Sequence, residues 1–169
     1  MHLRSHSGSI ESTDFHSILH SVLLPLLSPP PLSDPPLPIS LLLCGYSFGS
    51  LLASSCPPPP STSQFTFQTS YLLISYPLSV LWALTSFHSS TFTQALEERI
   101  RESNRMCVVY GDGDQFSGVG KLRSWSERLR GLGGGEERVK VVEVEGADHF
   151  WAKGETKRRA LEEVREWLE

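Results

Sequence analysis

The fold of this 169-residue chain is decided by one stretch, Leu41-Leu42-Leu43-Cys44-Gly45-Tyr46-Ser47-Phe48-Gly49-Ser50-Leu51-Leu52-Ala53. An apolar run leads into the pattern G-x-S-x-G and continues in small and apolar residues, which predicts a strand, a sharp turn and a helix. In such a nucleophile elbow the serine occupies a strained backbone position, and Gly45 and Gly49 let strand and helix approach without a Cβ clash. Ser47 is therefore a candidate nucleophile.

The residue after the serine adds a second feature. The Phe48 amide is expected in the first turn of the helix, where an unpaired N–H can donate a hydrogen bond to an oxyanion. A chain rich in serine and glycine also produces G-x-S-x-G by chance. A tight turn with a surface serine therefore remains the alternative until partner residues are found.

Further apolar runs predict more strands of the same sheet. Two of them, Tyr71 to Tyr76 and Met106 to Tyr110, lack polar alternation, which is typical of parallel strands covered on both faces. The other predicted strands are Ile39 to Cys44 and Val139 to Val144. Segments with helical spacing alternate with the strands; they begin at Phe48, Thr93, Val119 and Glu155. This alternation predicts an α/β fold, a mostly parallel sheet of about four strands flanked by helices.

Residues 1–38 are expected to differ from residues 39–169. Ser12 to Leu27 has apolar residues at helical spacing, which predicts an amphipathic helix. The prolines from Pro29 to Pro38 predict a stiff, extended connection into the first strand. We therefore divide the chain into an N-terminal helix with a proline-rich connection, 1–38, and an α/β domain, 39–169.

Charge is distributed unevenly along the chain. Only four of the 34 charged residues precede Glu97, and the net charge is −4. There is no block of Lys and Arg, so the sequence offers no electrostatic basis for binding nucleic acid. The uncharged span from Pro35 to Leu96 is interrupted by prolines and by many hydroxyl residues, and we expect no membrane-spanning helix.

The cysteines and histidines bear on location and on metals. Three cysteines, Cys44, Cys56 and Cys107, fit buried reduced thiols better than a disulfide framework, which favours a cytoplasmic location. His16 and His20 lie one helical turn apart, but no Cys or carboxylate cluster completes a ligand set. A solvated helix face is expected for them, and neither a metal nor a cofactor is predicted.

Two of the loops that follow predicted strands carry ionisable residues. The third strand is followed by Gly111-Asp112-Gly113-Asp114-Gln115-Phe116, and the fourth by Gly146-Ala147-Asp148-His149-Phe150-Trp151. Because parallel strands end at one edge of a sheet, Ser47, Asp114 and His149 can form one hydrogen-bonded relay. In it His149 removes the proton of Ser47, and a carboxylate fixes the imidazole.

Three aspartates compete for the role of the acid. Asp114 is preferred because it stands deeper in its loop and can turn toward the next one, whereas Asp112 is expected to cap the turn. Asp148 is a poorer candidate, since adjacent side chains in an extended loop point apart. A surface loop histidine is the alternative for His149, but its position after the last strand favours the base.

These segments resemble those of a known family. Gly45-Tyr46-Ser47-Phe48-Gly49 and the loops 111–116 and 146–151 resemble the catalytic segments of the α/β-hydrolase superfamily. More narrowly, LLLCGYSFGSLLAS, YLLISYPLSVLWALT and VVYGDGDQF resemble small fungal α/β-hydrolases related to dienelactone-hydrolase and acyl-peptidase-like proteins. The resemblance covers about Glu11 to the C-terminus. It implies Ser47 as nucleophile, Asp114 as acid and His149 as base, acting on a small acyl substrate, an ester or amide, through an acyl-enzyme.

The sequence departs from the family in one respect. In that fold four strands and an oxyanion loop precede the elbow, whereas 44 residues precede Gly45 here and they are predicted to be helix and proline-rich segment. We therefore expect an N-terminally truncated fold, without a second oxyanion donor, whose elbow strand is an open edge available for self-association. A catalytically impaired remnant without turnover is the alternative to an active hydrolase.

Overall fold

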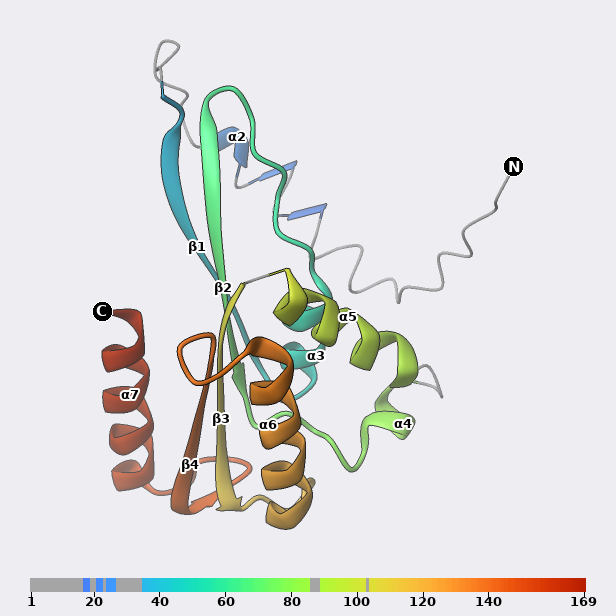
Figure 1. Ribbon diagram of the computed structural model, residues 1–169. Coiled ribbons are helices and arrows are strands. Elements are labelled where there is room, and N and C mark those ends of the chain that lie inside the picture. The colour runs from blue at the N-terminus through green and yellow to red at the C-terminus, as the bar shows by residue number, and fades with distance from the viewer. Residues whose placement is uncertain (1–16, 19–20, 23, 27–34, 86–88, 103) are drawn as a thin grey trace.

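The computed structural model describes residues 17–18, 21–22, 24–26, 35–85, 89–102 and 104–169. Four parallel strands form one sheet in the order β1-β2-β3-β4 (Figure 1). They are β1 (Leu37–Tyr46), β2 (Phe65–Ile74), β3 (Arg105–Gly113) and β4 (Val139–Asp148). The predicted α/β fold with a parallel four-stranded sheet is confirmed.

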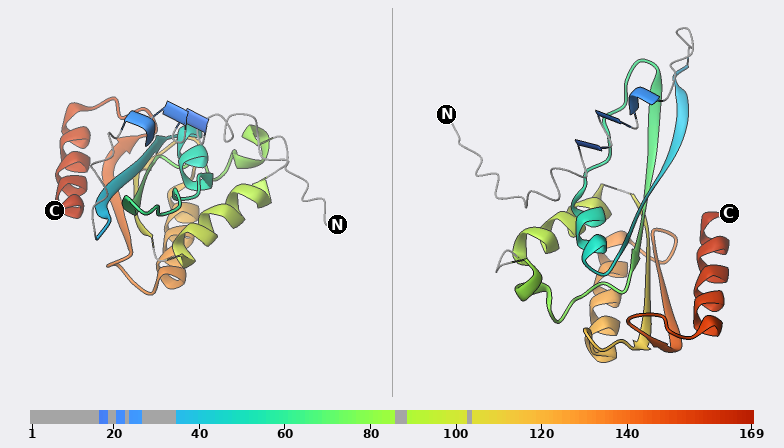
Figure 2. Two further views of the ribbon diagram at one scale, coloured as in Figure 1. Left: turned by 90° about the horizontal axis from the view of Figure 1, so that it is seen from above. Right: turned by 180° about the vertical axis from the view of Figure 1, so that it is seen from behind.

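Helices cover the two faces of the sheet unequally. Three of them pack on one face, and a single helix packs on the other, where it covers β3 and β4 (Figures 1 and 2). The first group is α3 (Phe48–Ser55), α5 (Ser89–Arg101) and α6 (Val119–Gly133), and the single helix is α7 (Gly154–Leu168). The short helices are α2 (Leu24–Leu26) and α4 (Leu81–Leu84).

Each predicted strand is present, and each is longer than the sequence indicated. The largest difference is in β2, which begins at Phe65 rather than at Tyr71. Residues 65–70 are rich in Phe, Thr, Gln and Ser and alternate between more and less exposed side chains, as a strand covered on one face does. Residues 65–70 contain no apolar run, because one face of this part of the sheet has no covering helix.

The structure tests only part of the predictions for the N-terminal residues. The predicted helix from Ser12 to Leu27 lies mostly outside the described residues; helical backbone is described at 17–18, 21–22 and in α2. The first strand begins at Leu37, two residues before the predicted start. The division into 1–38 and 39–169 stays a prediction.

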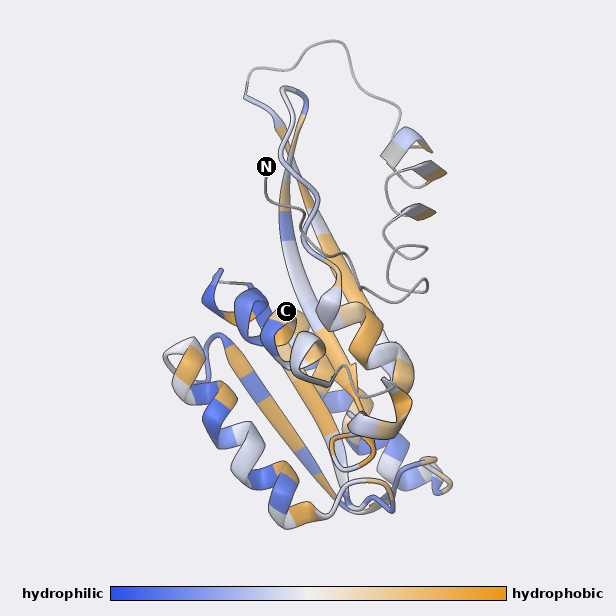
Figure 3. Ribbon diagram, turned by 90° about the vertical axis from the view of Figure 1, so that its right-hand side faces the viewer, coloured by the Kyte–Doolittle hydropathy of each residue, from blue (hydrophilic) through white to orange (hydrophobic). Residues whose placement is uncertain are grey.

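The hydrophobic core has two parts, one on each face of the sheet. The larger part lies under α3, α5 and α6 and contains fully buried residues such as Leu51, Leu73 and Ile100. The smaller part lies under α7 and includes Val109, Val142 and Trp167. The strands are largely hydrophobic, whereas the outer helices carry many hydrophilic residues (Figure 3).

Among the described residues, no helix combines the length and hydrophobicity needed to cross a bilayer.

On the face that α7 covers, the edge strand β1 remains exposed. Leu42 and Tyr46 on this face are 39% and 45% exposed, whereas Leu43 on the opposite face is buried against the larger core. A strand with one covered face shows this alternation of buried and exposed side chains. On this face of the sheet, β1 therefore has no covering helix.

The three cysteines are all free, and they differ in burial. Cys56 and Cys107 are fully buried, as predicted. Burial raises the pKa of the Cys56 thiol to about 11 and that of the Cys107 thiol to about 12. Cys44 is exposed, so the prediction of buried thiols is wrong for this residue. It lies on the face of β1 that no helix covers.

This difference predicts selective thiol modification of the folded protein. At pH 8 we expect a disulfide reagent such as DTNB to modify Cys44, while Cys56 and Cys107 stay protonated and shielded, because only the thiolate reacts. Denaturation in guanidinium should release all three thiols. Mass spectrometry after brief reaction counts the modified residues, and equal modification of Cys107 and Cys44 in the folded state would contradict the packing of β3.

Candidate active site

The turn between β1 and α3 holds Ser47 in a strained conformation. Its φ and ψ angles are 51° and −121°, in a region that non-glycine residues rarely adopt. Its amide donates a hydrogen bond to the Ile74 carbonyl at 2.9 Å, and its carbonyl accepts hydrogen bonds from the amide and hydroxyl of Ser50. Contacts on both sides therefore hold Ser47 at the end of β1, as expected for an elbow.

The two glycines of the motif have different roles. A Cβ added to Gly45 would overlap the backbone carbonyl of Gly49, so the strand and the helix are in contact at this point. A Cβ added to Gly49 would meet nothing within 4 Å. The expectation that the glycines prevent a Cβ clash is confirmed for Gly45. It is wrong for Gly49, which has room for a Cβ and takes part in the contact only through its backbone carbonyl.

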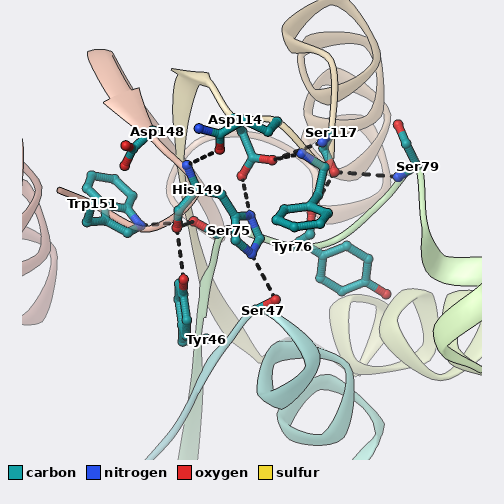
Figure 4. Close-up of polar contacts among 12 residues, drawn as sticks. Tyr46, Ser47, Ser75, Tyr76, Ser79, Asp114, Ser117, Asp148, His149 and Trp151 are labelled. Carbon is teal, nitrogen blue, oxygen red and sulfur yellow. Dashed lines mark hydrogen bonds and ion pairs between the residues drawn. The ribbon is translucent and has the colours of Figure 1, made fainter.

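Three residues from three strand ends meet in one chain of hydrogen bonds (Figure 4). The Nε2 atom of His149 lies 2.9 Å from the Ser47 hydroxyl oxygen, and its Nδ1 atom lies 2.7 Å from Oδ2 of Asp114. His149 is 3% exposed, and the Asp114 side chain is fully buried. The structure thus brings together all three residues that the sequence selected.

Backbone amides fix the orientation of the Asp114 carboxylate. Its Oδ1 atom accepts hydrogen bonds from the amides of Phe116 and Ser117 at 2.8 and 2.9 Å, which leaves Oδ2 for the imidazole. Because this carboxylate can only accept, His149 Nδ1 is the donor in their contact, and Nε2 of a neutral imidazole is then free to accept the Ser47 proton.

The two other aspartates bind backbone and do not contact the imidazole. Asp112 accepts a hydrogen bond from the Gly146 amide at 2.7 Å, and Asp148 accepts one from the Ala152 amide at 2.9 Å. The prediction that Asp112 caps its own turn is wrong: it ties the end of β3 to the loop after β4. The pairing of these strands shifts between Gly111 and Gly113, and Asp112 lies at the shift.

Aromatic side chains surround the histidine. The Phe116 ring lies edge-on to the imidazole with centroids 4.5 Å apart, and the Phe150 ring lies 5.4 Å away. Both phenylalanines are partly exposed, at 39% and 64%.

The backbone amide of Phe48 is available to a ligand. Phe48 is the first residue of α3, and an amide at this position has no acceptor within the helix.

Two residues that bind the His149 backbone were not predicted from the sequence. The Tyr46 hydroxyl donates to the His149 carbonyl at 3.0 Å, and the Gln115 side-chain oxygen accepts from the His149 amide at 3.0 Å. Each is adjacent in sequence to a residue that contacts the imidazole, Ser47 or Asp114. Their position next to Ser47 and Asp114 was the only indication in the sequence. The atoms that the Tyr46 and Gln115 side chains reach depend on the spacing of the strands, which the sequence does not show.

The described residues contain no group of three or more His, Cys, Asp or Glu side chains placed to hold a metal ion. The paired histidines His16 and His20 lie outside the described residues.

Comparisons with known proteins bear on the fold. No protein-family model and no curated protein matches the chain. Among solved structures, a thermophilic esterase from the Planctomycetes species Thermogutta terrifontis is similar in its native and its propionate-bound form, each with a TM-score of 0.51 and 20% identity. The match covers 75% of this chain and 53–54% of the esterase. An α/β serine hydrolase homologue from Coxiella burnetii has a TM-score of 0.43 at 17% identity over 75% of this chain and 46% of that one.

The chain thus shares an α/β fold with the thermophilic esterase. It spans about half the length of the solved structures that it matches.

The elbow geometry predicts opposite results for its two glycines. Gly45→Ala is expected to destabilise the protein by roughly 1–3 kcal/mol, because the added methyl overlaps the backbone of α3. Gly49→Ala is the matched control and should change stability by at most about 1 kcal/mol, since it meets open space and favours a helix. Urea denaturation followed by circular dichroism measures both, and a Gly45→Ala protein as stable as Gly49→Ala would contradict the close approach.

Proposed function

We propose that the protein is a serine hydrolase that acts on an ester or amide through an acyl-enzyme. The hydrogen-bonded chain from Ser47 through His149 to Asp114 carries this proposal. Supporting it are the strained turn that presents Ser47 and the buried, backbone-fixed carboxylate of Asp114. Nucleophile, base and orienting acid in this arrangement are typical of acyl transfer.

In the proposed reaction each of these residues has one chemical role. His149 Nε2 accepts the Ser47 proton as Oγ attacks the carbonyl carbon of the substrate, and Asp114 stabilises the resulting imidazolium. The Phe48 amide donates a hydrogen bond to the oxyanion. The imidazolium then gives its proton to the leaving alcohol or amine, and a water molecule activated by His149 hydrolyses the acyl-enzyme.

A catalytically impaired hydrolase remnant is the second candidate. The observation that favours it is the oxyanion site, for which we assign one donor among the described residues, the Phe48 amide. Removing one donor of such a site costs on the order of 10²- to 10³-fold in rate. We therefore expect acylation by activated substrates and slow turnover. The small acyl substrate, the cytoplasmic location and the lack of nucleic-acid partners remain predictions.

Covalent labelling with a fluorophosphonate tests the nucleophile without knowledge of the substrate. We expect the probe to label the folded protein at Ser47, and Ser47→Ala and His149→Ala to abolish labelling, because the hydroxyl and its base are both required. Intact-mass and peptide mass spectrometry identify the site. Absence of labelling in a folded sample would favour the remnant, and labelling of Ser47→Ala would exclude the elbow as the reactive site.

The choice between the aspartates is tested by a matched pair of variants. Asp114→Asn is expected to lower the labelling rate by several orders of magnitude, since an amide in place of the carboxylate favours the wrong imidazole tautomer. Asp112→Asn keeps an acceptor oxygen for the Gly146 amide and should label at nearly the normal rate. Equal rates for the two variants would remove Asp114 from the relay.

We also propose that the protein self-associates through the free edge of β1. The two edge strands of the described sheet differ in charge. On β4, Lys140 and Glu143 form ion pairs with Glu163 and Arg123, and charges of this kind protect an edge from pairing. β1 carries no charged residue. A second copy pairing along β1 would satisfy its outer backbone groups by a two-fold, self-complementary contact.

Charge placed on this edge should reverse the association. Light scattering after gel filtration is expected to show a concentration-dependent oligomer, which Leu42→Lys shifts toward the monomer, because a lysine on an edge strand opposes pairing. Leu161→Lys is the control, since Leu161 is also exposed and belongs to α7, which packs on β3 and β4. A monomeric wild-type protein at high concentration would contradict the proposal.

A further inference from the structure

The backbone of His149 is held from both sides by side chains that no step of the proposed reaction uses. Tyr46 donates its hydroxyl proton to the His149 carbonyl, and Gln115 accepts the His149 amide proton, each over 3.0 Å. The imidazole contacts Ser47 and Asp114 at the same time. Four hydrogen bonds therefore connect one residue to the C-terminal end of β1 and to the loop after β3, two through its side chain and two through its backbone.

We propose that Tyr46 and Gln115 are positioning residues that align the His149 imidazole with Ser47 and Asp114. This inference rests on the proposed function and deepens it. Each positioning residue is the chain neighbour of the residue that the imidazole must meet: Tyr46 precedes Ser47, and Gln115 follows Asp114. A shift of either loop thus moves the backbone of His149 together with the imidazole's partner.

The topology explains why such a restraint matters most for Tyr46. β1 and β4 are the two edges of the sheet and are separated by β2 and β3, which places them roughly 14 Å apart at the usual strand spacing. No ladder hydrogen bond joins these two strands. Without the Tyr46 hydroxyl, the end of β1 would be connected to the His149 loop chiefly by the contact between Ser47 and the imidazole.

The surroundings of Tyr46 keep its hydroxyl in the donor state. A phenol is protonated at neutral pH at its ordinary pKa, and partial burial, followed by the negative charges of Asp114 and Asp148, raises the pKa of Tyr46 further. The His149 carbonyl also lies 3.4 Å from the Ser75 hydroxyl, which in turn accepts a hydrogen bond from the Trp151 indole at 2.9 Å (Figure 4). The peptide after His149 is thus fixed by donors from two neighbouring strand ends.

Replacing Tyr46 by Phe removes the hydroxyl and keeps the ring beside the imidazole. We expect the rate of fluorophosphonate labelling and the kcat for 4-nitrophenyl acetate to fall about 10- to 100-fold, because a small misplacement of a catalytic group has an effect of this size. KM should stay within about twofold, since the variant loses alignment rather than substrate contacts. Gln115→Leu should act in the same direction, and Gln115→Glu, which keeps an acceptor oxygen, should restore most of the rate.

The matched control is Tyr71→Phe. Tyr71 also donates a hydrogen bond to a backbone carbonyl, that of Cys56 at 2.8 Å, but it is buried in the core away from His149. This variant is expected to lower the melting temperature and leave the labelling rate unchanged. Tyr46→Phe should show the reverse, because Tyr46 is about half exposed and one such hydrogen bond contributes little to stability.

A spectroscopic measurement separates this inference from the proposed function. The proton on His149 Nδ1, hydrogen-bonded to Asp114, should give a far-downfield NMR signal that broadens or is lost in Tyr46→Phe and in Gln115→Leu and persists in Tyr71→Phe. If the wild-type protein shows the signal but no labelling, and Tyr46→Phe and Gln115→Leu lose the signal, the proposed function fails and the positioning role stands. If Tyr46→Phe and Gln115→Leu both keep the signal and the wild-type labelling rate, the positioning role is overturned. If one of them fails to fold, the other decides.

Discussion

Four parallel strands that end at one edge of a sheet are the constraint on which the site depends. Ser47 follows β1, Asp114 follows β3 and His149 follows β4, so their separation in the chain has no influence on their separation in space. Parallel strands require helical crossovers, and these crossovers build the core that holds the strands in register. The arrangement of Ser47, Asp114 and His149 is therefore a consequence of strand direction, which the alternation of strands and helices specifies.

Much of this arrangement could be predicted from the sequence because the deciding features are local. The apolar run before Gly45 and the loops 111–116 and 146–151 each identify a strand end without any knowledge of the fold. The choice of Asp114 followed from its place in the loop, and the structure places its carboxylate against His149. The start of β2 and the exposure of Cys44 could not be predicted, because they depend on which face a helix covers, a property of the assembled layers.

Backbone strain at the site follows the same logic. Among the described residues, the non-glycine positions with positive φ are Ser47, Ser75 and Trp151, and each follows closely on the end of a strand of the site. Such conformations cost on the order of 1–3 kcal/mol each and persist only where the surroundings hold them. Here the Trp151 indole binds the Ser75 hydroxyl, and the Ser75 amide binds the Val109 carbonyl. Hydrogen bonds among the loops at the C-terminal ends of the strands thus support several strained residues around His149.

The least supported strand of this sheet carries Ser47, the proposed nucleophile. β1 has one neighbouring strand in the described structure and a helix on one face, whereas β3 lies between two strands and under helices on both faces. Edge elements with few buried contacts open more readily than central ones. Ser47 and Tyr46 are adjacent at the end of β1, so a movement of that end displaces both of their hydrogen bonds with His149 together. Alignment of the site is therefore coupled to the pairing of β1, and a strand added along that free edge would stabilise the geometry of Ser47 from a distance.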